Sequence, residues 1–362
     1  MEGFLSVLST IFFNIIIPLL VLSLLIFIHE LGHYLAARIM KVEVKEFSIG
    51  MGPRIFSFTK SKIKYSIKAI PMGGSVSMAG EDEESVSENA FYKKPVWKRF
   101  IVLFAGSFMN ILLGFVIMAV IVSGAKGFYS TKITRFVAGS VSNVNEISTE
   151  RLMESDEILS INGKKIKVYN DLLYAVIREG TDPINVTVIR DGEKTELKNI
   201  VFPVETVDGM TAGTVDFETE VYRNSFTETI KQTWYQSLST IDMLWTTLFD
   251  MITGRYGMEA VSGPVGVTQM IGESAKEATT TAGARNGFLF LISLITMNLG
   301  VVNLLPIPAM DGGRIVFLAI EFVRRKPIKP EYEGYVHLAG FALLILFMIF
   351  VTYKDIMKLV VG

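Results

Sequence analysis

The sequence predicts a polytopic α-helical membrane protein with four transmembrane helices, a membrane-associated β-hairpin and an α+β domain outside the membrane. First, 50% of its 362 residues are hydrophobic and the mean hydropathy is +0.42, which is high for a soluble enzyme. Second, four stretches are apolar over nearly the ~20 residues that a helix needs to cross a membrane. Third, a long polar region between the second and third stretches carries short β-type runs separated by turn signals.

The apolar stretches define the four expected spans. The first precedes a cluster of histidines, and it resembles a signal peptide in position only. Residues 1–9 carry no Lys or Arg, and no small-residue cleavage site follows, so we expect a retained span. The spans run approximately from Leu8 to Ile28, from Phe100 to Ser123, from Phe288 to Leu305 and from Tyr335 to Tyr353.

The distribution of charge predicts the orientation of these spans. From Arg38 to Arg99 there are 12 Lys and Arg against 7 Asp and Glu, whereas Lys126 to Arg285 has 16 against 22. The positive-inside rule therefore places the first loop in the cytoplasm and the acidic middle region outside. The formal net charge of −1 gives no sign of nucleic-acid binding, and the absence of cysteine leaves His, Asp and Glu as metal ligands.

The loops carry further elements. Alternating apolar residues around a Lys-Ser-Lys turn predict a β-hairpin within residues 43–80, although a solvated loop would also fit. Between Thr131 and Val204, turn signals at Asn162-Gly163 and Asp191-Gly192 predict a compact α+β domain with one helix near residues 171–179.

The region after this domain has two parts. Apolar residues at three- and four-residue spacing from Ser225 to Ile252 predict an amphipathic helix, at the membrane surface or packed on the domain. The Ala-, Thr- and Gly-rich stretch from Gly272 to Gly287 is expected to be loosely structured. The expected division is residues 1–124 (two spans and the hairpin), 125–205 (the α+β domain), 206–285 and 286–362 (two spans).

The run from His29 to His33 (HELGH) indicates a metal site. Two histidines four apart on a helix share one face and can hold one metal ion, and Glu30 can act as general base on a metal-bound water. The run lies at the end of an apolar span, where ionisable residues usually mark function. Chance occurrence, or capping at the membrane interface, is the structural alternative.

A catalytic zinc normally takes a third protein ligand, and the spacing leaves two suppliers open. His337 begins the last span and could equally be an interfacial histidine. Asp311 follows two prolines and precedes two glycines, which break the helix. Irregular backbone at membrane depth is tolerated where it is buried or lines a cavity, which favours Asp311.

These motifs together resemble the site-2 protease family of intramembrane zinc metalloproteases, and specifically the bacterial regulator-of-sigma-E protease type. The resemblance implies one Zn²⁺ on His29, His33 and Asp311, and a role for Asn303 in binding the substrate or the transition state. The family pattern Asn-x-x-Pro-x-Pro-x-Leu-Asp-Gly is met at Asn303, Pro306, Pro308, Asp311 and Gly312, with Met310 in place of leucine.

Other segments extend the resemblance over nearly the whole chain. Gly106 and Asn110 are similar to the family's Gly-x-x-x-Asn element, which assigns Asn110 to substrate or transition-state binding, although Ser107 stands where proline is common. Residues 155–166 resemble a single bacterial PDZ domain, residues 47–78 the family's β-element, and residues 262–267 a signature after the PDZ domain.

The resemblance implies intramembrane proteolysis in a bacterial cytoplasmic (inner) membrane. The PDZ domain would be extracytoplasmic and the active site would lie towards the cytoplasm. The implied substrates are single-span proteins already trimmed outside the membrane, such as anti-sigma factors, and signal-peptide remnants. The alternatives are a metal-binding membrane scaffold or transporter without hydrolysis, and a protease that cleaves ectodomains.

Overall fold

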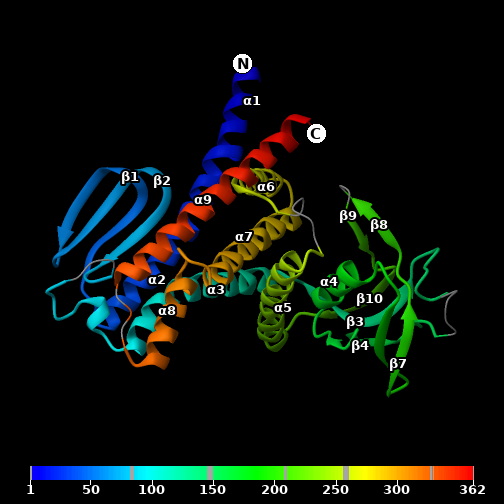
Figure 1. The fold of residues 1–362 in the computed structure, drawn as a ribbon. Helices are drawn as coiled ribbons and strands as arrows, with labels where there is room; N and C mark the ends of the chain where they lie inside the picture. The colour runs from blue at the N-terminus through cyan, green and yellow to red at the C-terminus, as the bar shows by residue number, and fades with distance from the viewer. Residues whose placement is uncertain are drawn as a thin grey trace. The chain divides into compact units, whose positions relative to one another are not determined.

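The computed structural model describes residues 2–81, 85–144, 150–207, 210–255, 261–326, 328 and 330–361. The chain forms two compact units (Figure 1), one of residues 1–117 with 244–362 and the other of residues 118–243. The first unit contains the expected hairpin, three of the expected spans and the second span up to Ile117, and the second unit contains the end of that span and the expected α+β domain. The finer division into four parts stays a prediction.

Four helical stretches among the described residues are long and apolar enough to cross a membrane, as the sequence predicted. Three of them extend beyond both ends of the expected run, whereas the third along the chain begins before Phe288 and ends at Asn303, two residues before Leu305. The first stretch is α1 (Glu2–Ile11), the π-helical η1 (Phe12–Ile16) and α2 (Ile17–Ile39); the others are α3 (Val96–Gly124), α7 (Ala282–Asn303) and α9 (Pro330–Val361).

Apart from the helix of the second unit, α4 (Tyr169–Glu179), three further helices lie in the described chain. The amphipathic helix expected between Ser225 and Ile252 is α5 (Phe226–Ile252), which crosses the boundary between the two units. In the first unit, α6 (Pro264–Glu277) packs on η1, α7 and α9, and α8 (Asp311–Arg324) follows the broken segment after α7.

The expectation of loose structure from Gly272 to Gly287 was wrong, because α6 and α7 cover most of it. Asp355 of α9 accepts hydrogen bonds from the backbone N–H groups of Gly263 and Gly266, which stabilises the start of α6. The Thr281 side chain caps α7. One of these stabilising groups, Asp355, lies far away in the sequence, and the other is a single capping residue. The amino-acid composition of the stretch therefore did not predict its helices.

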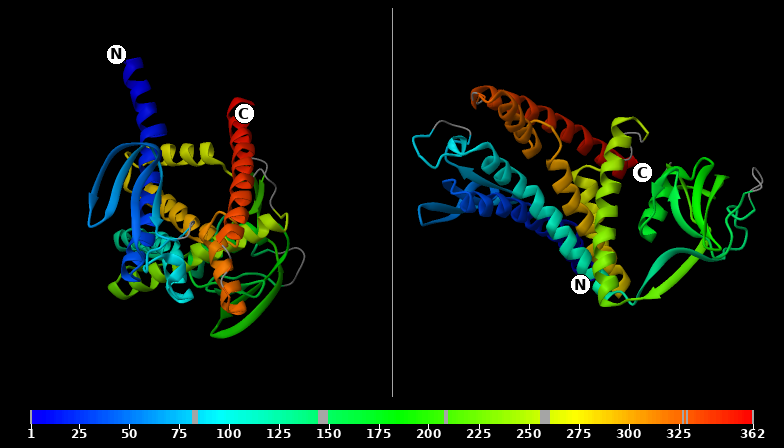
Figure 2. Two further views of the ribbon diagram at one scale, coloured as in Figure 1. Left: turned by 60° about the vertical axis from the view of Figure 1, so that its left-hand side comes forward. Right: turned by 90° about the horizontal axis from the view of Figure 1, so that it is seen from below.

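The predicted hairpin is confirmed, with β1 (Val44–Lys60) and β2 (Ile63–Met78) joined at the Lys-Ser-Lys turn. Both strands are bent, and each pairs with the other twice. The register gives a small sheet in the order 74–78, 44–49, 64–67 and 54–60. Figure 2 shows this sheet beside α2, which both strands contact. Residues 74–78 are therefore an edge of the sheet.

A buried apolar cluster holds this sheet against the first two spans. Ala36 and Ala37 of α2 and Val102 and Leu103 of α3 are fully or almost fully buried against β1, β2 and α8. The short 3-10 helix η2 (Phe91–Lys93) closes the cluster through Phe91. Because both strands are tied to the spans, their edge has a fixed place relative to α2.

The second unit contains an antiparallel sheet and α4 (Tyr169–Glu179), together with the end of α3 and the first part of α5. The strand order is β10-β3-β4-β6-β7, and β5 pairs with β4. A separate hairpin, β8 (Val204–Val207) with β9 (Met210–Gly213), contacts α4. The sheet strands are β3 (Gly127–Phe136), β4 (Glu157–Ile161), β5 (Lys164–Lys165), β6 (Ile184–Arg190), β7 (Glu193–Ile200) and β10 (Phe217–Arg223).

Both turn signals of this unit lie at hairpins. Asn162 and Gly163 join β4 to β5, and Asp191 and Gly192 join β6 to β7, all with positive φ. Positive φ at both central residues is typical of the tight hairpin turn that these pairs favour. The α+β architecture is confirmed, whereas its assignment as a PDZ domain stays a prediction.

Candidate metal centre

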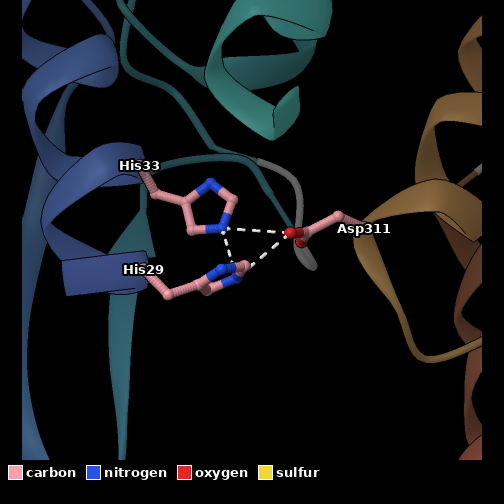
Figure 3. A group of neighbouring side chains, drawn as sticks. All are labelled: His29, His33 and Asp311. Carbon is pink, nitrogen blue, oxygen red and sulfur yellow. Dashed lines mark hydrogen bonds and ion pairs between the residues drawn. The ribbon is translucent and has the colours of Figure 1, made fainter. Parts of the chain in front are cut away.

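Three side chains converge between α2 and the start of α8. The Nε2 atoms of His29 and His33 lie 3.1 Å apart. Oδ2 of Asp311 lies 3.2 Å from Nε2 of His29 and 3.3 Å from Nε2 of His33. Figure 3 shows the two rings extending from one side of α2 and the carboxylate meeting them from the opposite side. Both histidines are buried.

This donor set fits a zinc ion. Tetrahedral zinc with ligand bonds of about 2.0–2.1 Å separates neighbouring ligand atoms by about 3.3 Å. The three separations, 3.1, 3.2 and 3.3 Å, agree with that value. Two imidazoles and one carboxylate also form a common catalytic set, which leaves a coordination position for water. The residues present therefore fit the metal that the sequence predicted.

Helix α3 holds the outer side of both imidazole rings. Nδ1 of His33 lies 2.8 Å from the carbonyl oxygen of Val102, so it carries the proton and leaves the Nε2 lone pair directed at the centre. Nδ1 of His29 lies 3.3 Å from the side-chain nitrogen of Asn110. Gly106 of α3 leaves room for the His33 ring, because a Cβ atom at this position would lie 2.2 Å from Nε2 of His33. Gly106 and Asn110 thus both lie against the histidines.

The segment after α7 positions Asp311. The helix ends at Asn303, and Ala309 takes a φ of +72°, which costs energy for a residue with a side chain. His337 of α9 accepts the backbone N–H of Ala309 at 2.8 Å. The two candidates for third ligand are therefore separated: Asp311 meets the histidines, and His337 supports the backbone that leads to Asp311.

Glu30 and the sheet edge line the same pocket as the metal-binding group. This pocket has a volume of about 410 Å³, and its walls include Asn303 and residues 75–78 of β2. Glu30 lies against Gly74, where a Cβ atom would come within 2.8 Å of its Cγ atom. Asn303 is more exposed than Asn110, and its side-chain nitrogen lies 3.5 Å from Nε2 of His29.

One ion pair in the pocket was not anticipated from the sequence. Arg314, one turn after Asp311, pairs with Glu81, which follows β2. The pair connects α8 to the end of the sheet edge. The only sequence signal for this pair was the position of Arg314, three residues after the candidate ligand Asp311. That position does not identify Glu81, 233 residues away, as the partner.

Comparison with known proteins agrees with this geometry. Residues 17–347 match the model of peptidase family M50. A Fusobacterium nucleatum protein with a provisional zinc metalloprotease name is 34% identical over 95% of this chain and 98% of its own length. The regulator of sigma-W protease RasP of Bacillus subtilis is 30% identical over 96% and 99%. Zinc metalloprotease RasP of Geobacillus kaustophilus is 28% identical over 95% and 98%.

Proposed function

This chain belongs to peptidase family M50, the site-2 protease family of metalloproteases, and from this premise we propose that it hydrolyses peptide bonds within transmembrane segments. One zinc ion would be held by His29, His33 and Asp311. The observation that carries the proposal is the convergence of these three side chains in a pocket that also contains Glu30.

Glu30 is the proposed general base and acid. When bound, zinc supplies a Lewis acid that polarises the peptide carbonyl and acidifies a water molecule. Glu30 would take the proton of that water and pass it to the leaving amine. A site built only to bind or carry metal has no use for a carboxylate beside the ligands, which argues against the scaffold and transporter alternative.

Asn303 is the proposed contact for the reacting peptide. It is partly exposed in the pocket, and its side-chain amide lies beside His29. An amide N–H placed there could donate to the oxygen on which negative charge develops during attack. Asn110 was expected to share this role, but its side chain is completely buried.

The edge of the hairpin sheet offers a place for the substrate strand. Residues 74–78 pair with β1 on one side, and residues 75–78 line the metal pocket together with Glu30. A helix in a membrane hides its peptide bonds in its own hydrogen bonds, so it has to unwind before hydrolysis. An unwound segment could add to this edge as a further strand and keep a peptide bond accessible.

The names of the relatives and the charge distribution support a finer proposal for the biological role. One relative is named as a regulator of sigma-W protease, which supports single-span proteins such as anti-sigma factors as substrates, with signal-peptide remnants as a second class. We propose that the chain lies in the bacterial cytoplasmic membrane, with the active site towards the cytoplasm and the α+β unit, proposed as a PDZ domain, outside.

Glu30→Gln tests the proposed chemistry. The purified variant should keep wild-type zinc content and lose cleavage of a model single-span substrate. Lys93→Gln, an exposed change on the same side of the predicted membrane, is the matched control and should cleave normally. Cleavage by Glu30→Gln at the wild-type rate would show that the proposed base is wrong.

Orientation has its own test, because the chain contains no cysteine. Lys93→Cys and Glu193→Cys each introduce a single exposed thiol, one in the first loop and one in the second unit. A membrane-impermeant reagent added outside the cell should label the second and not the first. The opposite pattern would reverse the proposed topology.

A further inference from the structure

The Asn110 side chain has a buried atom without a partner. Asn110 is 0% exposed, and its Oδ1 atom is buried and makes no hydrogen bond in the described chain. Its Nδ2 atom lies 3.3 Å from Nδ1 of His29. A buried acceptor that is left unpaired costs about 1–3 kcal/mol, so this arrangement requires an explanation.

The orientation of His29 supplies one. Nε2 of His29 faces Nε2 of His33 and Oδ2 of Asp311, so the lone pair on Nε2 is the one available to a metal. A neutral imidazole that uses one nitrogen as ligand carries its proton on the other. Nδ1 is therefore a donor, and it faces Nδ2 of Asn110, which is also a donor.

Exchange of the two amide atoms removes this conflict. A half-turn of the amide places Oδ1 against the N–H of His29, and the shape of the side chain stays the same. The acceptor without a partner and the donor without an acceptor then satisfy each other.

We propose that Asn110 is a positioning residue for the metal centre, whose side-chain oxygen accepts the Nδ1–H of His29 and fixes the ring with Nε2 towards the zinc. This inference rests on the proposed zinc site. Under this proposal α3 orients both histidine ligands, because the carbonyl oxygen of Val102 accepts the Nδ1–H of His33 in the same way. It also replaces substrate contact as the role of Asn110, since a completely buried side chain cannot reach a substrate.

Zinc affinity, measured by competition with a chromophoric chelator in detergent, tests the proposal independently of proteolysis. Asn110→Leu keeps the approximate volume and removes the acceptor, and it should weaken zinc binding by about 10–100-fold. Asn110→Asp keeps an acceptor and removes the donor, and it should bind zinc within about tenfold of wild type. Cobalt substitution provides a second readout, because the visible spectrum should change with Leu and be preserved with Asp.

Ser293→Ala is the matched control. Ser293 is also fully buried, and its hydroxyl donates to the carbonyl oxygen of Gly114 on α3 and not to either histidine. Its loss should leave zinc affinity unchanged. Wild-type zinc affinity in Asn110→Leu would overturn the proposal, and so would equal losses in the Asp and Leu variants.

If Asn110→Leu does not accumulate as folded protein, Asn110→Asp alone can test the proposal. Tight zinc binding by Asn110→Asp then supports the acceptor role, and a loss of a hundredfold or more overturns it. Failure of the proposed function has a different signature, because it would appear as absent cleavage or absent zinc in the wild-type protein itself.

Discussion

The ring of His33 lies directly on the backbone of α3 at Gly106, where a Cβ atom would meet Nε2 at 2.2 Å. The ligand face of α2 and the small-residue face of α3 are therefore parts of one structure. Gly-x-x-x-Asn motifs in spans are commonly explained by close packing of helices. Here the glycine admits a ligand ring, and the asparagine lies against the other ring.

Gly106→Ala should damage the metal site specifically. The added methyl group would displace the His33 ring, and we expect zinc affinity to fall by at least about tenfold. Gly124→Ala is the control on the same helix, because a Cβ atom there meets no atom within 4 Å. Equal zinc affinity in both variants, measured by chelator competition, would contradict the packing explanation.

Gly74→Ala should separate catalysis from metal binding. Its Cβ atom would lie 2.8 Å from Cγ of Glu30 and 3.2 Å from the Ser48 carbonyl oxygen, so either the base or the edge strand has to move. A displacement of about 1 Å can reduce the rate by about a hundredfold. We expect cleavage to fall by that order while zinc content stays at the wild-type level. Gly287→Ala, with no neighbour within 4 Å, should retain activity.

Asp311→Ala and His337→Ala should have different effects on zinc. Loss of Asp311 removes the only carboxylate of the described trio, so the variant should lose zinc on dialysis and have no activity. Loss of His337 removes the acceptor for the Ala309 N–H, so that variant should keep zinc and cleave more slowly. Zinc loss in His337→Ala with retention in Asp311→Ala would reverse the assignment. Metal analysis beside a proteolysis assay decides it.

The ion pair between Arg99 and Glu321 should stabilise the helix that carries Asp311. Arg99 is largely buried on α3, and both of its terminal nitrogens bond the Glu321 carboxylate of α8. Glu321→Ala leaves a buried charge unpaired, and we expect a loss of about 3 kcal/mol of unfolding free energy. Denaturant unfolding in detergent measures it.

A double variant provides the control for this ion pair. Arg99→Met with Glu321→Met removes both charges, so it should recover part of the stability that Glu321→Ala loses. Equal stability of wild type and Glu321→Ala would show that the pair contributes nothing to folding.

The sequence by itself determined the spans, the hairpin turn, the α+β domain and the pair His29 and His33. Each depends on local physics: apolar length, residue spacing along a helix, or the conformational preference of a turn pair. It also singled out Asp311 beside His337, although spacing along the chain left the choice between them open.

Only the tertiary structure decided which distant groups meet. It placed Asp311 282 positions after His29 at 3.2 Å, gave His337 to the Ala309 backbone, and brought Arg314 to Glu81. The tertiary structure also stabilises helices in the stretch after Gly272, through the hydrogen bond from the start of α6 to Asp355. Such contacts depend on how helices pack across hundreds of residues, and no local pattern in the chain encodes that geometry.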